Sequence, residues 1–298
     1  MALKEAIDGV LLLDKPAGLT SNQALQQAKR TLGAEKAGHT GTLDPMATGL
    51  LPLCFGEATK FSRFLLEGDK SYLATIRFGI ATDTGDKEGQ VIAKKDIYVD
   101  EEALKNVLLS FLGTSTQYPP MYSALKKNGK PLYEYARQGL SVERKERKIT
   151  LHTLELLSCT RTEATLHIHC STGTYIRTLG EDIAKKLGTV GHLISLRRLK
   201  SNHFTVENSY PLDELKKKTY AEKRALLLPI TALLPDFPTL TLEEKQSQKI
   251  KNGLPVQMTL NCAIISLFTL FDNTGKFLGV GTYQASEKKL KPLRLIRG

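Results

Sequence analysis

The chain has 298 residues, 41% of them hydrophobic, which is enough for one large and one small domain, each with a core of its own. Its formal net charge of +11 indicates a polyanionic partner such as nucleic acid, although a basic solvated surface would give the same balance. The charged N-terminus, residues 1–8, and the lack of a long apolar run argue against a signal peptide and a membrane span.

The cysteines give no indication of a disulfide framework or of a zinc site. They lie far apart and form no Cys-x-x-Cys pair: Cys54, Cys159, Cys170 and Cys262. We therefore expect a protein of the reducing cytoplasm that holds no metal.

A strand and a helix are predicted first. The apolar run at residues 10–13 is typical of a buried strand, which ends at Lys15-Pro16. A helix follows, because Thr20 or Ser21 can cap it, Gly33 can end it, and apolar residues recur at helical spacing: Leu25, Ala28 and Leu32.

The next segment, residues 38–52, sets one acidic side chain among residues that shape the backbone. Pro45 favours an extended conformation for Asp44, and three glycines permit tight turns or close approach of a ligand: Gly38, Gly41 and Gly49. We expect a connecting loop that presents Asp44 as a nucleophile. The alternative is that Asp44 caps a short helix with Pro45 at its first position.

The middle of the chain alternates strands and helices without a βαβ rhythm. Residues 72–78 alternate cleanly and predict a strand that begins at Tyr72, and residues 82–89 form a polar, glycine-punctuated loop. An amphipathic helix is expected at residues 101–112.

Residues 119–148 have the texture of an insertion. Eight basic residues stand against three acidic ones, and four tyrosines lie among them or just before them (Tyr118, Tyr122, Tyr133 and Tyr135). Basic side chains between aromatic rings suit an RNA backbone with unstacked bases. A solvated loop anchored by its tyrosines is the alternative.

A strand over residues 165–170 leads into a helix with Ile176, Leu179, Ile183 and Leu187 at core spacing. Arg177 falls in the first turn of this helix, where a cation opposes the helix dipole, so it indicates either a specific anionic partner or an ordinary surface arginine. A boundary is expected near residues 234–238. The tail beyond it predicts a helix at 243–252, a hairpin at 266–280 and a last strand at 293–296, which suggests a small β-barrel docked on the main domain.

Several motifs together resemble the TruB family of pseudouridine synthases, over about residues 8–205. They are Lys15-Pro16, the 38–52 segment with Gly56-Glu57-Ala58-Thr59-Lys60, Lys70-Ser71-Tyr72, and the run from Cys170 to Arg177. Within the family, residues 121–126 and 132–139 look like the bacterial stand-alone enzyme that isomerises uridine 55 in the tRNA T-loop.

The resemblance implies an α+β pseudouridine synthase fold with a central mixed, mainly antiparallel sheet flanked by helices. It implies a catalytic domain at residues 1–235, which carries the RNA-binding insertion 119–148, and a small β-rich PUA-like domain at 236–298. The implied catalytic residues are Asp44, Tyr72 and Arg177. The implied substrate-binding residues are His39, Tyr72, Tyr175, Leu196, Lys15 and Asp86.

The implied reaction exchanges the uracil C1′–N1 bond for a C1′–C5 bond and needs neither a metal nor an organic cofactor. The target uridine must leave its stack, and His39 is a plausible wedge for the gap. We also expect Arg177 to pair with Asp44 and to keep it anionic. The expected partner is the tRNA T-arm alone, with no guide RNA, obligate protein or membrane, and the chain is expected to be a monomer.

Two rival interpretations remain at this point. The chain would be an RNA-binding or tRNA-folding module if Asp44 were only structural. It would be a guide-RNA-dependent relative if it were inactive on its own.

Overall fold

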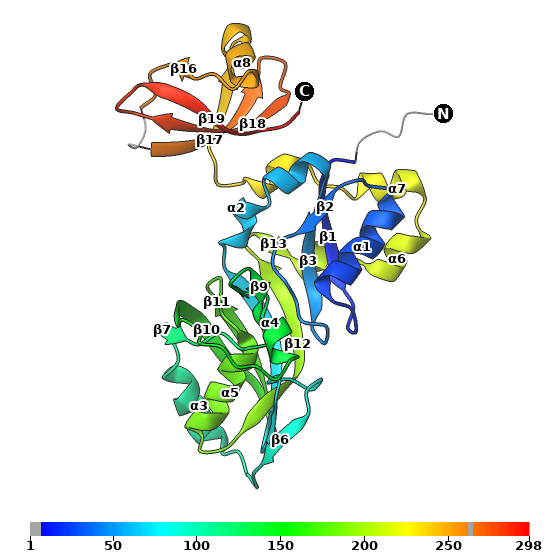
Figure 1. Cartoon of the computed structure of the whole chain (residues 1–298), viewed down its shortest axis with the longest axis vertical. Helices are drawn as coiled ribbons and strands as arrows, with labels where there is room; N and C mark the ends of the chain where they lie inside the picture. Colours follow the sequence, from blue (N-terminus) through cyan, green and yellow to red (C-terminus); the bar gives the residue numbers. More distant parts are fainter. Residues whose placement is uncertain (1–6, 262–264, 298) are drawn as a thin grey trace.

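The computed structural model describes residues 7–261 and 265–297. Figure 1 shows an elongated molecule in which a large mixed sheet with its helices carries a second, smaller sheet at one end. The strands of the large sheet are β1 (Gly9–Lys15), β2 (Ala37–His39), β3 (Thr48–Phe55), β4 (Lys70–Phe78), β7 (Gly113–Gln117), β10 (Arg147–Cys159), β11 (Glu163–Cys170), β12 (Gly191–Ser201), β13 (Phe204–Thr205) and β14 (Tyr210–Pro211).

The strand order of the large sheet is β14-β1-β3-β12-β4-β11-β10-β7, with β2 on β3 and β13 on β12. Only the β1–β14 and β3–β12 pairs are parallel, so the expected mixed, mainly antiparallel sheet is confirmed. Because β3 and β4 both pair with β12, the segment before β3 and the start of β4 come together although they are far apart in sequence.

The longer helices cover one face of this sheet. Helices α1 (Ser21–Leu32), α3 (Glu101–Leu109) and α5 (Ile176–Lys186) share one hydrophobic core with β1, β3, β4 and β11. Thr20 caps α1 with a full capping box, and Gly33 ends the helix in the left-handed conformation, as the sequence predicts. Helix α3 is shorter than expected, because the chain leaves the helix at Ser110.

Shorter elements complete the large domain. They are η1 (Gly56–Lys60), α2 (Arg63–Leu66), the hairpin β5 (Ile80–Thr82) and β6 (Val91–Lys94), η2 (Val206–Asn208), α6 (Leu212–Lys217), α7 (Tyr220–Ala225) and η3 (Ile230–Leu233). The glycine-rich segment 38–52 is not the single connection that we expected. Both of its ends are strands, β2 and β3, since its apolar end pairs with β1 in the core, and only the middle is a loop.

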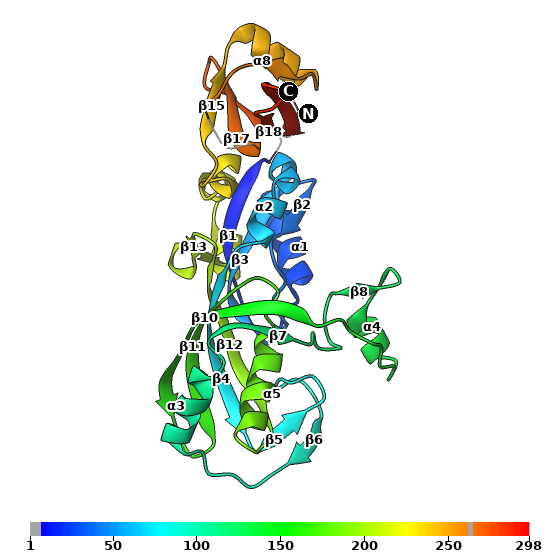
Figure 2. The same cartoon turned by 90° about the vertical axis from the view of Figure 1, so that its left-hand side faces the viewer.

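The basic insertion stands away from the body of the molecule. Figure 2 shows β8 (Lys126–Lys127), β9 (Lys130–Pro131) and α4 (Leu132–Ala136) on an arm that projects from the sheet. Its last two residues, Arg147 and Lys148, already belong to β10, where they pair with β7.

The C-terminal sheet contains β15 (Thr239–Leu242), β17 (Ile265–Asp272), β18 (Phe277–Gln284), β19 (Lys289–Leu295) and β16 (Val256–Gln257) in that order, with α8 (Glu244–Lys251) packed beside it. The predicted helix and hairpin are present, and in the described part of the chain the five strands of the expected small barrel form a half-barrel, in which β15 and β16 end the strand order. The sheet docks on the large domain as expected: Val280 shares a core with β1, and the rings of Phe61 and Phe277 lie 5.5 Å apart. The exact domain boundary at residue 235 stays a prediction.

Cys54, Cys159 and Cys170 carry free thiols, whereas Cys262 and residues 1–6 lie outside the described residues. Within the described chain, no helix has both the length and the hydropathy to cross a bilayer.

Candidate active site

Asp44 opens a tight turn. The Ala47 N–H donates to the Asp44 carbonyl at 3.1 Å, and Pro45 occupies the second turn position, which its ring favours. No helix follows, so the alternative of Asp44 as a helix cap is wrong. The Ser21 hydroxyl fixes the loop to α1, because it accepts from the Leu43 N–H at 2.7 Å and donates to the Leu43 carbonyl at 3.0 Å.

Lys15 stabilises this loop by hydrogen bonds to backbone carbonyls. Its side chain is fully buried, and its ammonium donates to the carbonyls of Leu19, Pro16 and Pro45 at 2.7, 2.8 and 3.3 Å. Burial lowers the pKa of Lys15 to about 8. The three donors of its ammonium bind backbone carbonyls, one of which is that of Pro45 in the Asp44 loop. The role of Lys15 in substrate binding stays a prediction.

Arg177 joins the Asp44 loop to two other segments, the 82–89 loop and the insertion. Its Nε lies 2.9 Å from Asp44 Oδ2 and its Nη2 lies 3.1 Å from Asp44 Oδ1, which makes a two-pronged pair. Nη2 also donates to the Tyr122 carbonyl at 2.6 Å, and Nη1 donates to the Thr84 carbonyl at 2.8 Å. The pairing of Arg177 with Asp44 expected from the sequence is therefore present, and the guanidinium also contacts the insertion.

Asp86 provides a second carboxylate beside Arg177. Its Oδ2 lies 3.7 Å from Arg177 Nε, and its Oδ1 accepts from the Thr84 hydroxyl at 2.7 Å and from the Glu88 N–H at 3.0 Å. Only 5% of the Asp86 side chain is exposed, against 31% for Asp44. Asp86 thus faces inward to Arg177, while Asp44 keeps an open side.

The electrostatics of Asp44 follow from this arrangement. Burial raises the pKa of Asp44, and Arg177 is the strongest opposing influence. Asp86 adds to the rise and Lys15 counters it. The charge on Asp44 therefore depends on Arg177 more than on any other neighbour.

Tyr72 lies on β4 and is 7% exposed. Burial raises its pKa to about 12, and the charge of Arg198 is the strongest opposing influence, so the phenol is neutral at pH 7. Arg198, on β12, is a functional candidate that the sequence analysis missed. The only signal for it was a pair of arginines, Arg197 and Arg198, inside an apolar stretch.

The remaining predicted residues occupy three different places. His39 is half-buried on β2, and its Nδ1 is a buried atom with no hydrogen-bond partner among the described residues. Burial and the nearby Arg198 both lower the pKa of His39. Tyr175 precedes α5, where its N–H donates to Gln117 Oε1 at 2.8 Å, and Leu196 lies in the core opposite Ala74.

The insertion is held by its own contacts. Arg144 donates to the Pro119 carbonyl at 3.0 Å and so ties the two ends of the arm together. Lys130 lies over the ring of Tyr135 and Arg137 over the ring of Tyr133. Most of its basic side chains reach solvent, including Lys126 and Lys145, so the arm presents positive charge beside Arg177.

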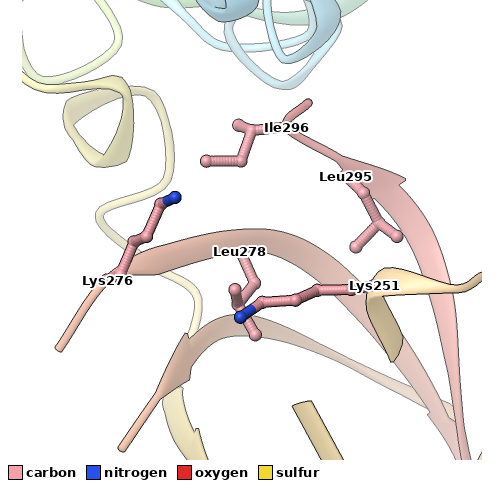
Figure 3. A pocket seen from close by; sticks show the side chains of 5 residues that line it. All are labelled: Lys251, Lys276, Leu278, Leu295 and Ile296. Carbon is pink, nitrogen blue, oxygen red and sulfur yellow. The ribbon is translucent and has the colours of Figure 1, made fainter. Parts of the chain in front are cut away.

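Two cavities lie away from this cluster. One opens in the C-terminal domain, where Lys251 and Lys276 flank Leu278, Leu295 and Ile296 (Figure 3). The other lies at the far end of the large sheet and includes Arg77 and Lys95. No group of metal-binding side chains is found in the part of the chain that the structure describes.

Family comparisons cover nearly the whole chain. Residues 29–176 match the TruB family pseudouridylate synthase N-terminal domain, residues 177–235 the tRNA pseudouridylate synthase B C-terminal domain, and residues 238–296 the pseudouridine synthase II TruB C-terminal domain.

Similar proteins include the tRNA pseudouridine synthase B of Burkholderia mallei, 49% identical over 98% of both chains, and that of Methylobacillus flagellatus, 46% identical over 99% of this chain and 97% of the relative. Among solved structures, one from a Cbf5-Nop10-Gar1 complex has the same fold, with a TM-score of 0.72 and 24% identity over 98% of this chain and 84% of that one. The chain therefore belongs to the TruB family of pseudouridylate synthases.

Proposed function

We propose that this chain converts uridine 55 in the T-loop of tRNA into pseudouridine, acting alone and without a cofactor. The observation that carries the proposal is the two-pronged pair between Arg177 and Asp44, because it sets a guanidinium, which favours the charged form, against one carboxylate at a partly open position. The names of the relatives, all tRNA pseudouridine synthase B, support tRNA as the substrate. The sequence of the insertion supports the T-arm.

The reaction is an isomerisation, so its atoms balance within the nucleotide. The bond from C1′ to N1 breaks, the uracil turns while it stays bound, and a bond from C1′ to C5 forms. The proton on C5 leaves and N1 gains one. Such a reaction needs an anion near C1′, a proton carrier and a surface that retains the detached base.

Asp44 is the proposed anion. It either attacks C1′, attacks the uracil ring or removes a ribose proton, and each of these steps needs the carboxylate form. Arg177 favours that form, and it stays in place because its other donors bind the carbonyls of Tyr122 and Thr84. Asp86 holds Arg177 from its buried side.

Tyr72 is the proposed proton carrier and stacking surface. A phenol with its pKa near 12 keeps its proton at pH 7 and can donate or relay it. Tyr175 and Leu196 are proposed to contact the turned base. His39, with its lowered pKa, is an uncharged ring that can fill the gap left by the flipped uridine.

The insertion is proposed to bind the phosphates of the arm. Its exposed lysines and arginines release counterions when they meet a phosphate, so binding should weaken steeply with salt. Since cytoplasmic tRNA is the substrate, we place the protein in the cytoplasm. The near-complete coverage of relatives named as tRNA enzymes favours this function over a guide-dependent one.

The test is pseudouridine mapping on an unmodified tRNA transcript. Carbodiimide-treated RNA should stop reverse transcription at position 55 after incubation with the wild-type chain alone, and not after incubation with Asp44→Asn. A pure RNA-folding module would leave no pseudouridine with either protein. Dependence on a guide would show as activity that appears only when a second RNA is added.

A further inference from the structure

Four residues form one row across four neighbouring strands. In the register of the sheet, Lys15 of β1 is opposite Gly49 of β3, Gly49 is opposite Arg198 of β12, and Arg198 is opposite Tyr72 of β4. Residues opposite one another in a sheet point to the same face. Arg198 therefore occupies the position between the strand that follows the Asp44 loop and the strand that carries Tyr72.

Arg198 and Lys15 are the two cations of this row, and both are buried. Only 1% of Arg198 is exposed, and none of the ion pairs among the described residues includes it. Its Nε donates to the Leu50 carbonyl at 2.7 Å and its Nη2 to the Gly41 carbonyl at 3.2 Å. These two carbonyls lie on either side of Asp44 in the sequence, so one guanidinium holds both ends of its loop.

The glycines of the loop fit this contact. A side chain at Gly41 would come within 3.4 Å of Arg198 Nη1, and a side chain at Gly49 would meet the Arg198 carbonyl at 2.3 Å. Gly49 also has a φ of +99°, which glycine tolerates best. The close approach of β3 to Arg198 therefore requires glycine at position 49, whereas at position 41 there is room for a Cβ beside the guanidinium.

The same guanidinium belongs to the residue opposite Tyr72 in the sheet, and its charge opposes the rise that burial causes in the pKa of the phenol. An arginine N–H can only donate, so the favourable arrangement turns the phenol oxygen toward the guanidinium. The phenol hydrogen must then point away from Arg198. In this arrangement Tyr72 is a donor with a defined direction, and Arg198 sets that direction.

We propose that Arg198 is a positioning residue for the isomerisation, which fixes the Asp44 loop and the Tyr72 hydroxyl relative to each other without touching the RNA. The proposal rests on the proposed function, since it concerns the two groups that the reaction is proposed to use. It assigns Arg198 an effect on the chemical step and none on RNA binding.

The test compares Arg198→Lys with Arg197→Lys. Arg197 offers a matched control because it is the adjacent residue and its guanidinium bonds Asp14, at 2.7 and 3.0 Å, and Thr48, at 3.4 Å, but neither Asp44 nor Tyr72. Tritium release from C5 of uridine in a T-arm hairpin gives the single-turnover rate, and filter binding of the same hairpin gives the affinity. Misplacement of reacting groups by about 1 Å costs roughly 100-fold in rate. We expect a loss of that size in Arg198→Lys with affinity within about threefold, and wild-type behaviour in Arg197→Lys.

A second comparison uses Tyr72→Phe. Because Arg198 acts partly through the phenol, the fold loss in rate of the double variant Arg198→Lys/Tyr72→Phe should be clearly smaller than the product of the losses of the two single variants. Equal losses in rate and affinity, or multiplicative effects, would overturn the proposal. If Arg198→Lys does not fold, Arg198→Gln, which keeps two N–H donors, takes its place. If neither variant folds, Arg198 has a structural role and the proposal is refuted. A wild-type chain that releases no tritium refutes the proposed function instead.

Discussion

The Asp44 cluster, which consists of Asp44, Asp86 and Arg177, lies next to the basic insertion, but the charges of the two regions differ in burial and in their partners. In the cluster, Arg177 is 5% exposed, and its bonds join the Asp44 loop, the 82–89 loop and the insertion. In the insertion, the cations reach solvent and contact mainly the arm itself. The two meet at one bond, from Arg177 to the Tyr122 carbonyl.

This difference separates chemistry from binding. Charges that are desolvated and paired interact strongly at short range. Exposed charges attract the RNA phosphates and release their counterions, and this attraction is screened by salt. Substitutions in the cluster should therefore change turnover or stability, and substitutions in the insertion should change affinity.

The largest effect is expected from Asp44→Asn. Removal of the anion should lower the single-turnover rate by more than about 10⁴-fold, as loss of a nucleophile does in other enzymes. Affinity for the T-arm hairpin should stay within about threefold, because Asn keeps the size of the side chain. Retained turnover would leave Asp44 with a structural role only.

Arg177→Met should destabilise the protein by about 3 kcal/mol, because it leaves two carboxylates without their cation. The figure is taken at the low end, since about a third of the Asp44 side chain is exposed. Urea unfolding measures the change. Adding Asp44→Asn to the variant should restore part of the loss, and Arg197→Met, which breaks a more exposed pair with Asp14, should cost less than about 1 kcal/mol.

Tyr72→Phe should keep stacking and lose proton transfer. The expected fall in rate is about 100-fold, at the lower end of the range for general acid–base groups, with affinity unchanged. Full turnover by this variant would show that the phenol is dispensable and would limit Tyr72 to stacking.

In the insertion, the double variant Lys126→Ala/Lys145→Ala should weaken binding and leave turnover at saturating RNA unchanged. If both lysines meet phosphates, the slope of log affinity against log salt should fall in magnitude by about 1.5. Lys217→Ala/Lys245→Ala changes two equally exposed lysines outside the arm and serves as the control. An unchanged slope in the insertion variant would mean that the arm is only a solvated loop.

The sequence predicted the parts of the fold that carry local signals. Capping residues and apolar spacing located α1 and α5, and strict alternation located β4. The place of Arg177 came from the resemblance and from its unfavourable position in the first helical turn. The glycine-rich segment was less clear, since glycines and prolines hid the fact that its apolar end is a central strand.

The role of Arg198 and the burial of Lys15 were beyond local reasoning. Both depend on the register of β1, β3, β12 and β4, which aligns residues more than a hundred positions apart. No spacing along the chain encodes that row. A lysine before proline and a double arginine look the same whether they are buried or solvated.

The contrast between buried and exposed charges also predicts how the free energy of unfolding depends on pH. Burial lowers the pKa of Lys15 and Lys70 from 10.5 to about 8, so above pH 8 the folded chain releases protons that the unfolded chain still holds. The free energy of unfolding should therefore rise from pH 8 to 9, by at most about 1.4 kcal/mol per lysine. Above pH 9 the buried thiols of Cys54 and Cys170, with pKa values raised to about 12 and 11, should oppose the rise, because the unfolded chain loses those protons first.

Urea titrations at pH 8 and 9 measure this slope. Lys70→Met should halve it, since one of the two buried ammonium groups is gone, whereas Lys126→Ala/Lys145→Ala should not change it, since those lysines are exposed in both states. A stability that falls between pH 8 and 9 would mean that the ammonium groups of Lys15 and Lys70 are stabilised by their carbonyl partners more than burial penalises them. Lys15 and Lys70 would then resemble the lysines of the insertion, because folding would not disfavour their charged form.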